Sequence, residues 1–156
     1  MKHQNIVFLD IDGPMIPSSC YLAYGVMASF ERRFSPLAVA CINRLCHETK
    51  AKIVFNTTHN RFYGDKLVDE AIREGIKKGF IHPTSPKTKY PELNNRLEAI
   101  HLWINENSEK PVRWVSFDDA DVGENNILID FDYGVGVKEI NQAMKILNKG
   151  TPVIIL

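Results

Sequence analysis

Residues 6–14 read IVFLDIDGP, and this stretch decides the fold. Its apolar start, residues 6–9, has the length and composition of a strand that is buried on both faces of a sheet. Two aspartates, Asp10 and Asp12, follow the apolar run, and Gly13 comes next. A carboxylate at the end of a buried strand costs free energy unless it is paired or binds a cation. Because ligands of open α/β sheets bind just beyond the carboxyl ends of the strands, this placement predicts a cation site and chemistry there.

The bulk composition is that of an ordinary globular protein. The chain has 156 residues, of which 44% are hydrophobic and 24% charged, and we expect a single domain over residues 1–156. Its 19 basic and 19 acidic residues give a formal net charge of zero. A neutral chain is not the type that binds nucleic acid by charge alone, although a local basic patch stays open.

Neither a membrane span nor a signal peptide is visible in the sequence. No apolar segment approaches the roughly 18 residues of a spanning helix, and the apolar start of the chain runs straight into Asp10, so we expect no membrane partner. The three cysteines, Cys20, Cys41 and Cys46, are an odd and sparse set that suits a reducing compartment better than a disulfide framework. The predicted location is therefore the cytoplasm.

Strand-like apolar runs alternate with segments of helical period, which predicts an α/β fold with a central parallel sheet flanked by helices. The expected strands are residues 6–10, 52–55, 112–117 and 127–130, with shorter candidates at 80–81 and 153–156. The expected helices begin after Ser35 and at Pro91, run through residues 68–76 to a stop near Gly79, and run from residue 137 to a stop near Gly150. Residues 14–34 follow no period, and we expect them to form an insertion near the end of the first strand.

Polar side chains also follow the second and third expected strands. Residues 56–59 read NTTH, and the sequence FDDAD begins at residue 117. In a parallel sheet these strand ends lie on one edge. If the three strands are neighbours, the side chains that meet there are Asp10, Asp12, Asp118, Asp119 and Thr57 or Thr58. Carboxylates in one place repel each other, and oxygen ligands with few histidines favour Mg²⁺ over Zn²⁺ as the cation that holds them.

At these positions the chain resembles the haloacid dehalogenase (HAD) superfamily of phosphotransferases. DIDG after a buried strand looks like its first motif, a hydroxyl residue after a second strand like its second, and an Asp-Asp pair after a later strand like its fourth. The pattern FLDIDG, KIVFNTTHN, NRLEAIHLWI and FDDAD is most similar to the small HAD domains of RNA-repair-type proteins. Those domains usually read Ser-Ser-Trp-Arg where this chain reads NTTHN from residue 56. The resemblance implies a Rossmann-like HAD fold in which residues 14–34 form a minimal cap.

The resemblance also implies roles for the four aspartates. Asp10 would attack phosphorus and form an aspartyl-phosphate, which splits hydrolysis into two easier steps. Asp12 would protonate the leaving oxygen and then deprotonate the attacking water. In the family, Mg²⁺ is held by the first aspartate, the backbone carbonyl of the second and an aspartate of the later pair. Asp119 is favoured here as that direct ligand, with Asp118 acting from the outer shell.

Four further residues are candidates for contact with the phosphorylated substrate. The hydroxyl of Thr57 would hydrogen-bond the transferring phosphoryl group, with Thr58 as the reserve candidate. His59 could contact substrate, and a solvated loop histidine is the equal alternative. Gly13 would let the chain leave the strand sharply without a side chain that blocks the phosphate.

The cation of the superfamily's third motif has two candidates in this chain. Lys89 lies just before Pro91 at the start of an expected helix, which is a common place for it. Arg96, in NRLEAI, matches the RNA-repair-like subgroup better and is favoured slightly. Such a cation, with Mg²⁺, would offset the repulsion between a carboxylate nucleophile and a phosphate anion.

The predicted function is a Mg²⁺-dependent phosphomonoester hydrolase of the HAD type. The chain has no room for a large cap that encloses a small substrate, so we expect either a substrate that covers the site itself, such as a nucleic-acid end or a phosphoprotein, or closure by the insertion, residues 14–34, and a partner subunit. One alternative is a phosphotransferase on a small phosphorylated metabolite or nucleotide. Another is a catalytically silent HAD-like domain for binding or regulation, against which the intact Asp10 and Asp12 argue. The sequence leaves the oligomeric state open.

Overall fold

The computed structural model describes residues 3–57, 60–85, 96–108 and 110–148. Its centre is a sheet of four parallel strands in the order β2-β1-β3-β4. The strands are β1 (Gln4–Leu9), β2 (Lys52–Phe55), β3 (Val112–Asp118) and β4 (Asn126–Leu128). The predicted α/β fold with a central parallel sheet is confirmed.

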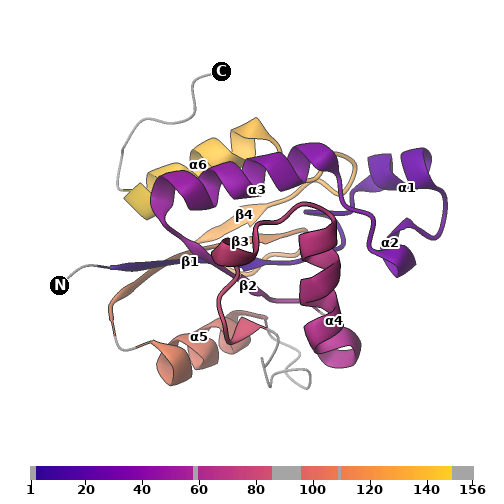
Figure 1. Cartoon of the computed structure of the whole chain (residues 1–156). Coiled ribbons are helices and arrows are strands. Elements are labelled where there is room, and N and C mark those ends of the chain that lie inside the picture. The colour runs from indigo at the N-terminus through magenta and orange to yellow at the C-terminus, as the bar shows by residue number, and fades with distance from the viewer. Residues whose placement is uncertain (1–2, 58–59, 86–95, 109, 149–156) are drawn as a thin grey trace.

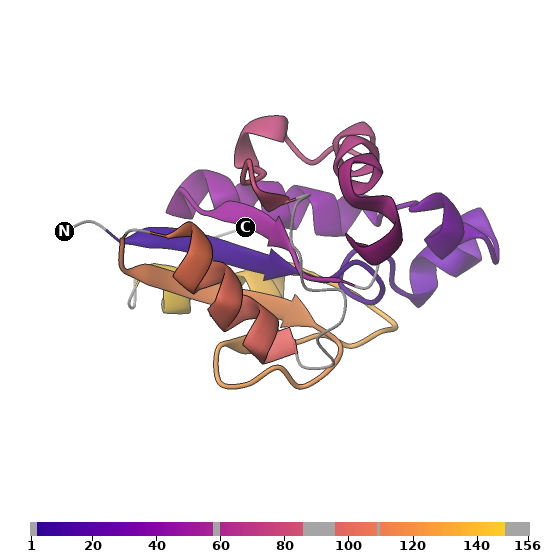
Figure 2. The ribbon, with the colours of Figure 1, turned by 90° about the horizontal axis from the view of Figure 1, so that it is seen from below.

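Helices cover both faces of this sheet. Figure 1 shows α3 and α6 on one face and α5 on the other, and Figure 2 views the sheet from the side of α5. The helices are α1 (Ser18–Tyr24), α2 (Ala28–Glu31), α3 (Pro36–Thr49), α4 (Asn60–Arg73), the 3-10 turn η1 (Lys78–Phe80), α5 (Arg96–Asn107) and α6 (Val137–Asn148). The α3 helix begins as predicted, because the Ser35 side chain accepts a hydrogen bond from the Ala38 N–H.

The central strand β1 is buried on both faces, as its apolar sequence predicts. Val7 and Leu9 lie in the core cluster beneath α3 and α6, while Ile6 and Phe8 lie in a second cluster with residues of α5. The Phe8 ring meets the edge of the Trp103 ring with their centroids 5.6 Å apart. Because successive residues of a strand point to opposite faces, one apolar run supplies both clusters.

The end of α4 differs from the prediction. The helix ends at Arg73, and Gly75 then takes a φ of 114°, which a glycine adopts without strain. The Ile76 N–H donates to the carbonyl of Ala71, so Ile76 folds back into the core after the turn. The predicted stop at Gly79 is wrong, because that residue belongs to η1.

Two other boundary predictions have mixed outcomes. The short strand expected at residues 80–81 is reduced to a single bridge between Ile81 and Ile53. The predicted helix start at Pro91, the stop near Gly150 and the strand at 153–156 lie outside the described residues.

Residues 14–34, the insertion, carry the two short helices α1 and α2 beyond the carboxyl end of β1. The strand arrows point toward the end of the molecule at which these helices lie (Figure 2). The insertion leaves apolar side chains in solvent: Leu22 is 89% exposed, Val26 87% and Phe30 68%. That the chain is one domain with a cap-like insertion stays a prediction. Among the described residues, no helix has the length and apolar character needed to cross a membrane.

Candidate active site

The carboxyl ends of β1, β2 and β3 meet at one edge of the sheet. Leu9 of β1 is level with Phe55 of β2 and with Phe117 of β3. The backbone pairing continues past the strand end, since the Asp10 N–H donates to the Phe117 carbonyl at 3.1 Å and the Asn56 N–H to the Leu9 carbonyl at 2.9 Å. The three strands are therefore neighbours, which is the condition on which the predicted convergence of side chains depends.

Three of the predicted carboxylates gather at this edge. Asp10, Asp118 and Asp119 each place a carboxylate oxygen within 4.8 Å of the others. Asp10 and Asp118 are 4% and 1% exposed, whereas Asp119 reaches solvent. Buried carboxylate oxygens beside an exposed one form a donor set that suits a hard divalent cation such as Mg²⁺, which keeps part of its water shell.

Gly13 makes room for one of these carboxylates. Its φ of 98° lies in the region that favours glycine, which agrees with a sharp turn after the strand. A Cβ atom at this position would lie 3.2 Å from Cβ and Cγ of Asp119. Any larger residue at position 13 would therefore press on a candidate metal ligand.

Arg96 is the cation that the structure brings to the cluster. Its Nη1 lies 2.9 Å from Oδ2 of Asp10 and 2.5 Å from Oδ2 of Asp118. The Asn56 side-chain amide donates to the Arg96 carbonyl at 3.4 Å, which ties the start of α5 to the end of β2. The other candidate, Lys89, lies outside the described residues.

Burial dominates the electrostatics of the cluster. It raises the pKa of Asp10 to about 7 against the opposing charge of Arg96, and the charge of Asp118 adds to the rise. Burial also raises the pKa of Asp118. Burial lowers the pKa of Arg96, but the two carboxylates outweigh that effect and hold its pKa above the ordinary range. The described part of this edge thus gathers three carboxylates around the guanidinium of Arg96, and a divalent cation would supply further positive charge.

Asp12 is engaged differently from the other three aspartates. Its Oδ1 accepts a hydrogen bond of 2.5 Å from Oγ of Ser29, a residue of α2 in the insertion. Sequence reasoning did not single out Ser29, because the insertion has no period that assigns a face to any of its residues. The only available signal was the position of the insertion, directly after the aspartates.

Of the remaining polar residues near the strand ends, some lie within the described part of the chain and others do not. Thr57 is half-buried just past the end of β2, while Thr58 and His59 lie outside the described residues. Asp121 and Asp130 form loop contacts: their Oδ1 atoms accept from the N–H groups of Gly123 and Asp132, at 3.1 and 2.8 Å.

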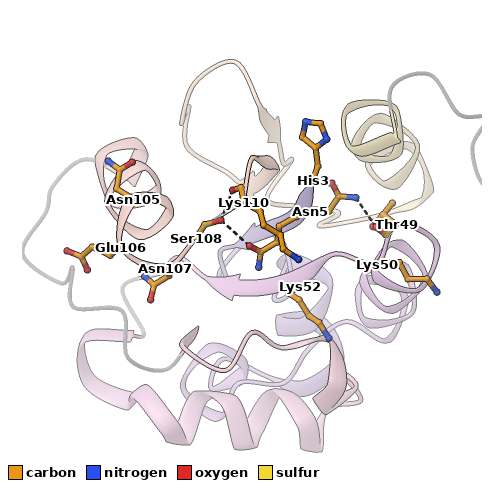
Figure 3. A pocket seen from close by; sticks show the side chains of 11 residues that line it. His3, Asn5, Thr49, Lys50, Lys52, Asn105, Glu106, Asn107, Ser108 and Lys110 are labelled. Atoms are coloured by element: carbon orange, nitrogen blue, oxygen red, sulfur yellow. Dashed lines mark hydrogen bonds between the residues drawn. The ribbon is translucent and has the colours of Figure 1, made fainter. Parts of the chain in front are cut away.

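A hollow lies at the opposite edge of the sheet (Figure 3). It has a volume of about 650 Å³ and is lined by the starts of β1 and β2, the end of α3 and the end of α5. Its charged residues include Lys50, Lys52, Lys110 and Glu106, and the rest of its lining is mainly amide and hydroxyl side chains. It shares no residue with the carboxylate cluster, so we place the candidate active site at the carboxyl edge.

Comparison with known families gives a match that covers this edge of the sheet. The model of the HAD domain in Swiss Army Knife RNA repair proteins matches residues 6–139. The chain belongs to this family. The matched range includes every aspartate of the cluster and Arg96. The match confirms the resemblance to the HAD domains of RNA-repair-type proteins that the sequence motifs indicated. Searches of curated proteins and of solved structures gave no match.

Proposed function

We propose that this HAD domain is a Mg²⁺-dependent phosphomonoester hydrolase that works through an aspartyl-phosphate on Asp10. One observation carries the proposal: Asp10, Asp118 and Asp119 converge within 4.8 Å at the ends of neighbouring strands, and Arg96 contacts Asp10. A silent binding domain has no need of a buried carboxylate whose ionisation the fold opposes. Burial of this kind favours a nucleophile, because a desolvated carboxylate attacks more readily than a hydrated one.

The metal would be held by the carboxylates of Asp10 and Asp119 and by the backbone carbonyl of Asp12, with Asp118 in the outer shell. Bound there, Mg²⁺ would supply positive charge that lets an anionic nucleophile approach a phosphate. Asp118 is already bonded to Arg96 at 2.5 Å and accepts from the Ala120 N–H at 2.9 Å. These bonds support an orienting role for Asp118 and leave direct coordination to the exposed Asp119.

The reaction then proceeds in two displacements. A carboxylate oxygen of Asp10 attacks phosphorus, the ester P–O bond breaks, and Asp12 gives its proton to the leaving oxygen. Water next attacks the aspartyl-phosphate, Asp12 takes a proton from that water, and inorganic phosphate leaves with Asp10 restored. Arg96 would balance the charge of Asp10 and of the phosphoryl oxygens throughout, and Lys89 is the alternative for this role.

The phosphoryl group would lie above Gly13 at the mouth of the site. There the hydroxyl of Thr57 would donate a hydrogen bond to it, with Thr58 and His59 as further candidates for substrate contact. These roles agree with the positions of Gly13 and Thr57 beside the carboxyl ends of β1 and β2.

The substrate that fits this site best is the phosphorylated end of a polynucleotide. The matched family occurs in RNA repair proteins, and an insertion of two short helices leaves room for a large substrate. Residues 14–30 of the insertion contain no charged residue, and Phe30 is 68% exposed. An uncharged rim with an exposed ring suits stacking of a base better than contacts with a phosphate backbone.

The test is turnover of a defined substrate panel with Mg²⁺. The panel contains RNA oligonucleotides with a 3′- or a 5′-phosphate, a nucleoside monophosphate, a phosphopeptide and p-nitrophenyl phosphate. We expect phosphate release to be fastest with an oligonucleotide and to vanish in Asp10→Asn. Asp69→Asn, at an exposed position of α4, is the matched control and should turn over like the wild type.

The alternatives give different results in the same experiment. Transfer of the phosphoryl group to an added alcohol in preference to water would indicate a phosphotransferase. Absence of both turnover and an Asp10-dependent phosphoenzyme with reactive aryl phosphates would contradict the hydrolase and favour a silent binding domain.

A further inference from the structure

The insertion contacts the candidate acid/base residue, Asp12, through the side chain of Ser29. Oγ of Ser29 donates to Oδ1 of Asp12 at 2.5 Å, a distance typical of a strong hydrogen bond from a hydroxyl to a carboxylate. Such a bond limits rotation of the carboxylate about its Cβ–Cγ bond. It therefore fixes the direction in which the second oxygen of Asp12 faces, which is the property that a proton donor needs.

Contacts with α4 hold Ser29 in this place. The helix that carries it, α2, spans only Ala28–Glu31 and has too few residues to be stable alone. Arg32 follows α2 with a φ of 50° and is 3% exposed. Its guanidinium bonds both carboxylate oxygens of Glu70 on α4, through Nε and, at 2.7 Å, through Nη2.

Further hydrogen bonds and a second ion pair, between Arg33 and Glu74 at 3.6 Å, join the same segments. The Phe34 N–H donates to Oε1 of Glu74 at 2.9 Å, and Nη2 of Arg73 donates to the carbonyl of Glu31 at 3.1 Å. The end of α2 is thus fastened to the last turn of α4 by a bidentate ion pair and by backbone contacts. We call these contacts, among residues 31–34 and 70–74, the α2–α4 clasp.

We propose that Ser29 is a positioning residue that holds the carboxylate of Asp12 for proton transfer, and that the α2–α4 clasp holds Ser29. This inference rests on the proposed hydrolase function. In this arrangement the insertion is more than a rim around the site, because it orients one of the two reacting aspartates. The sheet orients the other, Asp10, through the backbone pairing of β1 with β3.

The chemistry of the leaving group separates this role from a purely structural one. A poor leaving group, such as a ribose hydroxyl or a simple alcohol, needs a proton from Asp12 as the P–O bond breaks. A good one, such as 2,4-dinitrophenolate, leaves without a proton. Loss of positioning should therefore slow the first kind of substrate and spare phosphoenzyme formation from the second.

The experiment compares Ser29→Ala with the wild type on an alkyl or nucleoside phosphate and on 2,4-dinitrophenyl phosphate. We expect kcat for the poor leaving group to fall about tenfold, a fraction of the full effect of a general acid, with KM nearly unchanged. Phosphoenzyme formation from the dinitrophenyl ester should stay within about twofold of the wild type in a single turnover. Ser29→Thr keeps the hydroxyl and should restore most of the activity.

Two further variants complete the design. Ser19→Ala, at an exposed position of the neighbouring helix α1, should behave like the wild type on both substrates. In an Asp12→Asn background, Ser29→Ala should cause little additional loss, because both changes remove the same function. Thermal unfolding of each variant checks that the fold is intact.

The outcomes separate the two proposals. The role of Ser29 alone would be overturned if the wild type shows Asp10-dependent turnover and Ser29→Ala keeps full activity. The same conclusion would follow if Ser29→Ala slows the reactions of both kinds of substrate equally. A wild-type protein without turnover or phosphoenzyme would overturn the hydrolase and this role with it.

Discussion

Removal of the charge of Glu70 should destabilise the fold strongly. The variant Glu70→Gln keeps the shape of the side chain but leaves the guanidinium of Arg32, whose side chain is 4% exposed, without its counter-ion. Breaking a buried pair from one side typically costs about 3–5 kcal/mol. We predict a loss at the lower end of this range, about 3 kcal/mol. For a chain of this size that corresponds to a fall in Tm of roughly 10 °C.

The control for Glu70 is an ion pair of the same type on the surface. Arg44 and Glu48 of α3 lie 2.8 Å apart, with side chains 57% and 38% exposed. Because solvent screens such pairs, Glu48→Gln should change the free energy of unfolding by less than about 1 kcal/mol. Urea unfolding of both variants gives the two values directly. An equal, small loss for Glu70→Gln and Glu48→Gln would refute the reasoning that the α2–α4 clasp is energetically important.

The pH dependence gives a second check with a definite sign. Hydrogen bonds from Arg32 lower the pKa of Glu70, and this effect outweighs burial, which raises it. A carboxyl group whose pKa is lower in the folded state stabilises the fold above its unfolded pKa and loses that contribution as the pH falls through its folded pKa. The difference in stability between wild type and Glu70→Gln should therefore be full at neutral pH and shrink below about pH 4. The double variant Arg32→Met/Glu70→Met, which leaves no unpaired charge, should recover much of the loss.

Three further predictions concern the carboxylate cluster. Burial raises the pKa of Asp10 to about 7, so Mg²⁺ binding should release a proton and should be tighter at about pH 8 than at about pH 6. Calorimetry in two buffers of different ionisation enthalpy measures the proton release and the affinity. Equal affinities at the two pH values would contradict the prediction. Gly13→Ala places a Cβ 3.2 Å from Asp119 at a φ of 98° and should weaken Mg²⁺ binding about tenfold or more, whereas Gly79→Ala, with nothing within 4 Å, should bind normally. Arg96→Met should lower kcat about a hundredfold and Lys89→Met should leave it near the wild type; the reverse order would assign the cation to Lys89.

Most of the fold follows from local sequence patterns that favour one type of structure. The apolar run of β1 can be satisfied only between two layers, and Ser35 followed by Pro36 favours the start of a helix and nothing else. The end of α4 was not predictable in the same way, because Gly75 and Gly79 are equally good local stops. Ile76 decides between them: it is 1% exposed after the turn, and a Cβ on Gly75 would lie 3.0 Å from Val39 of α3. That packing is tertiary information, which a helical period cannot contain.

In the candidate site, too, some residues could be placed from the sequence, whereas others depend on tertiary packing. Asp10, Asp118 and Asp119 could be placed together from the sequence because parallel strands bring their carboxyl ends to one edge. Arg96 lies 22 residues from Asp118 and could be proposed only from the family motif, since its position depends on how α5 packs on the sheet. The Ser29–Asp12 bond could not be anticipated, because it depends on the α2–α4 clasp, whose ion pair joins residues 38 apart.

The two aspartates of the proposed reaction are held by different parts of the fold, and we expect these parts to differ in stability. Asp10 is joined to the sheet by the bond from its N–H to the Phe117 carbonyl, next to the buried strand β1, and we expect it to open only with global unfolding. Asp12 is hydrogen-bonded to Ser29 of a four-residue helix, and two ion pairs, Arg32–Glu70 and Arg33–Glu74, and several hydrogen bonds tie the end of this helix to α4. A weakened α2–α4 clasp should therefore impair proton transfer before it impairs nucleophilic attack. In Glu70→Gln, at a temperature where the sheet is intact, phosphoenzyme should still form from an aryl phosphate with a good leaving group, while turnover of a nucleoside phosphate falls. Equal loss of both activities would mean that the insertion and the sheet open together, and that the fold does not separate the two steps.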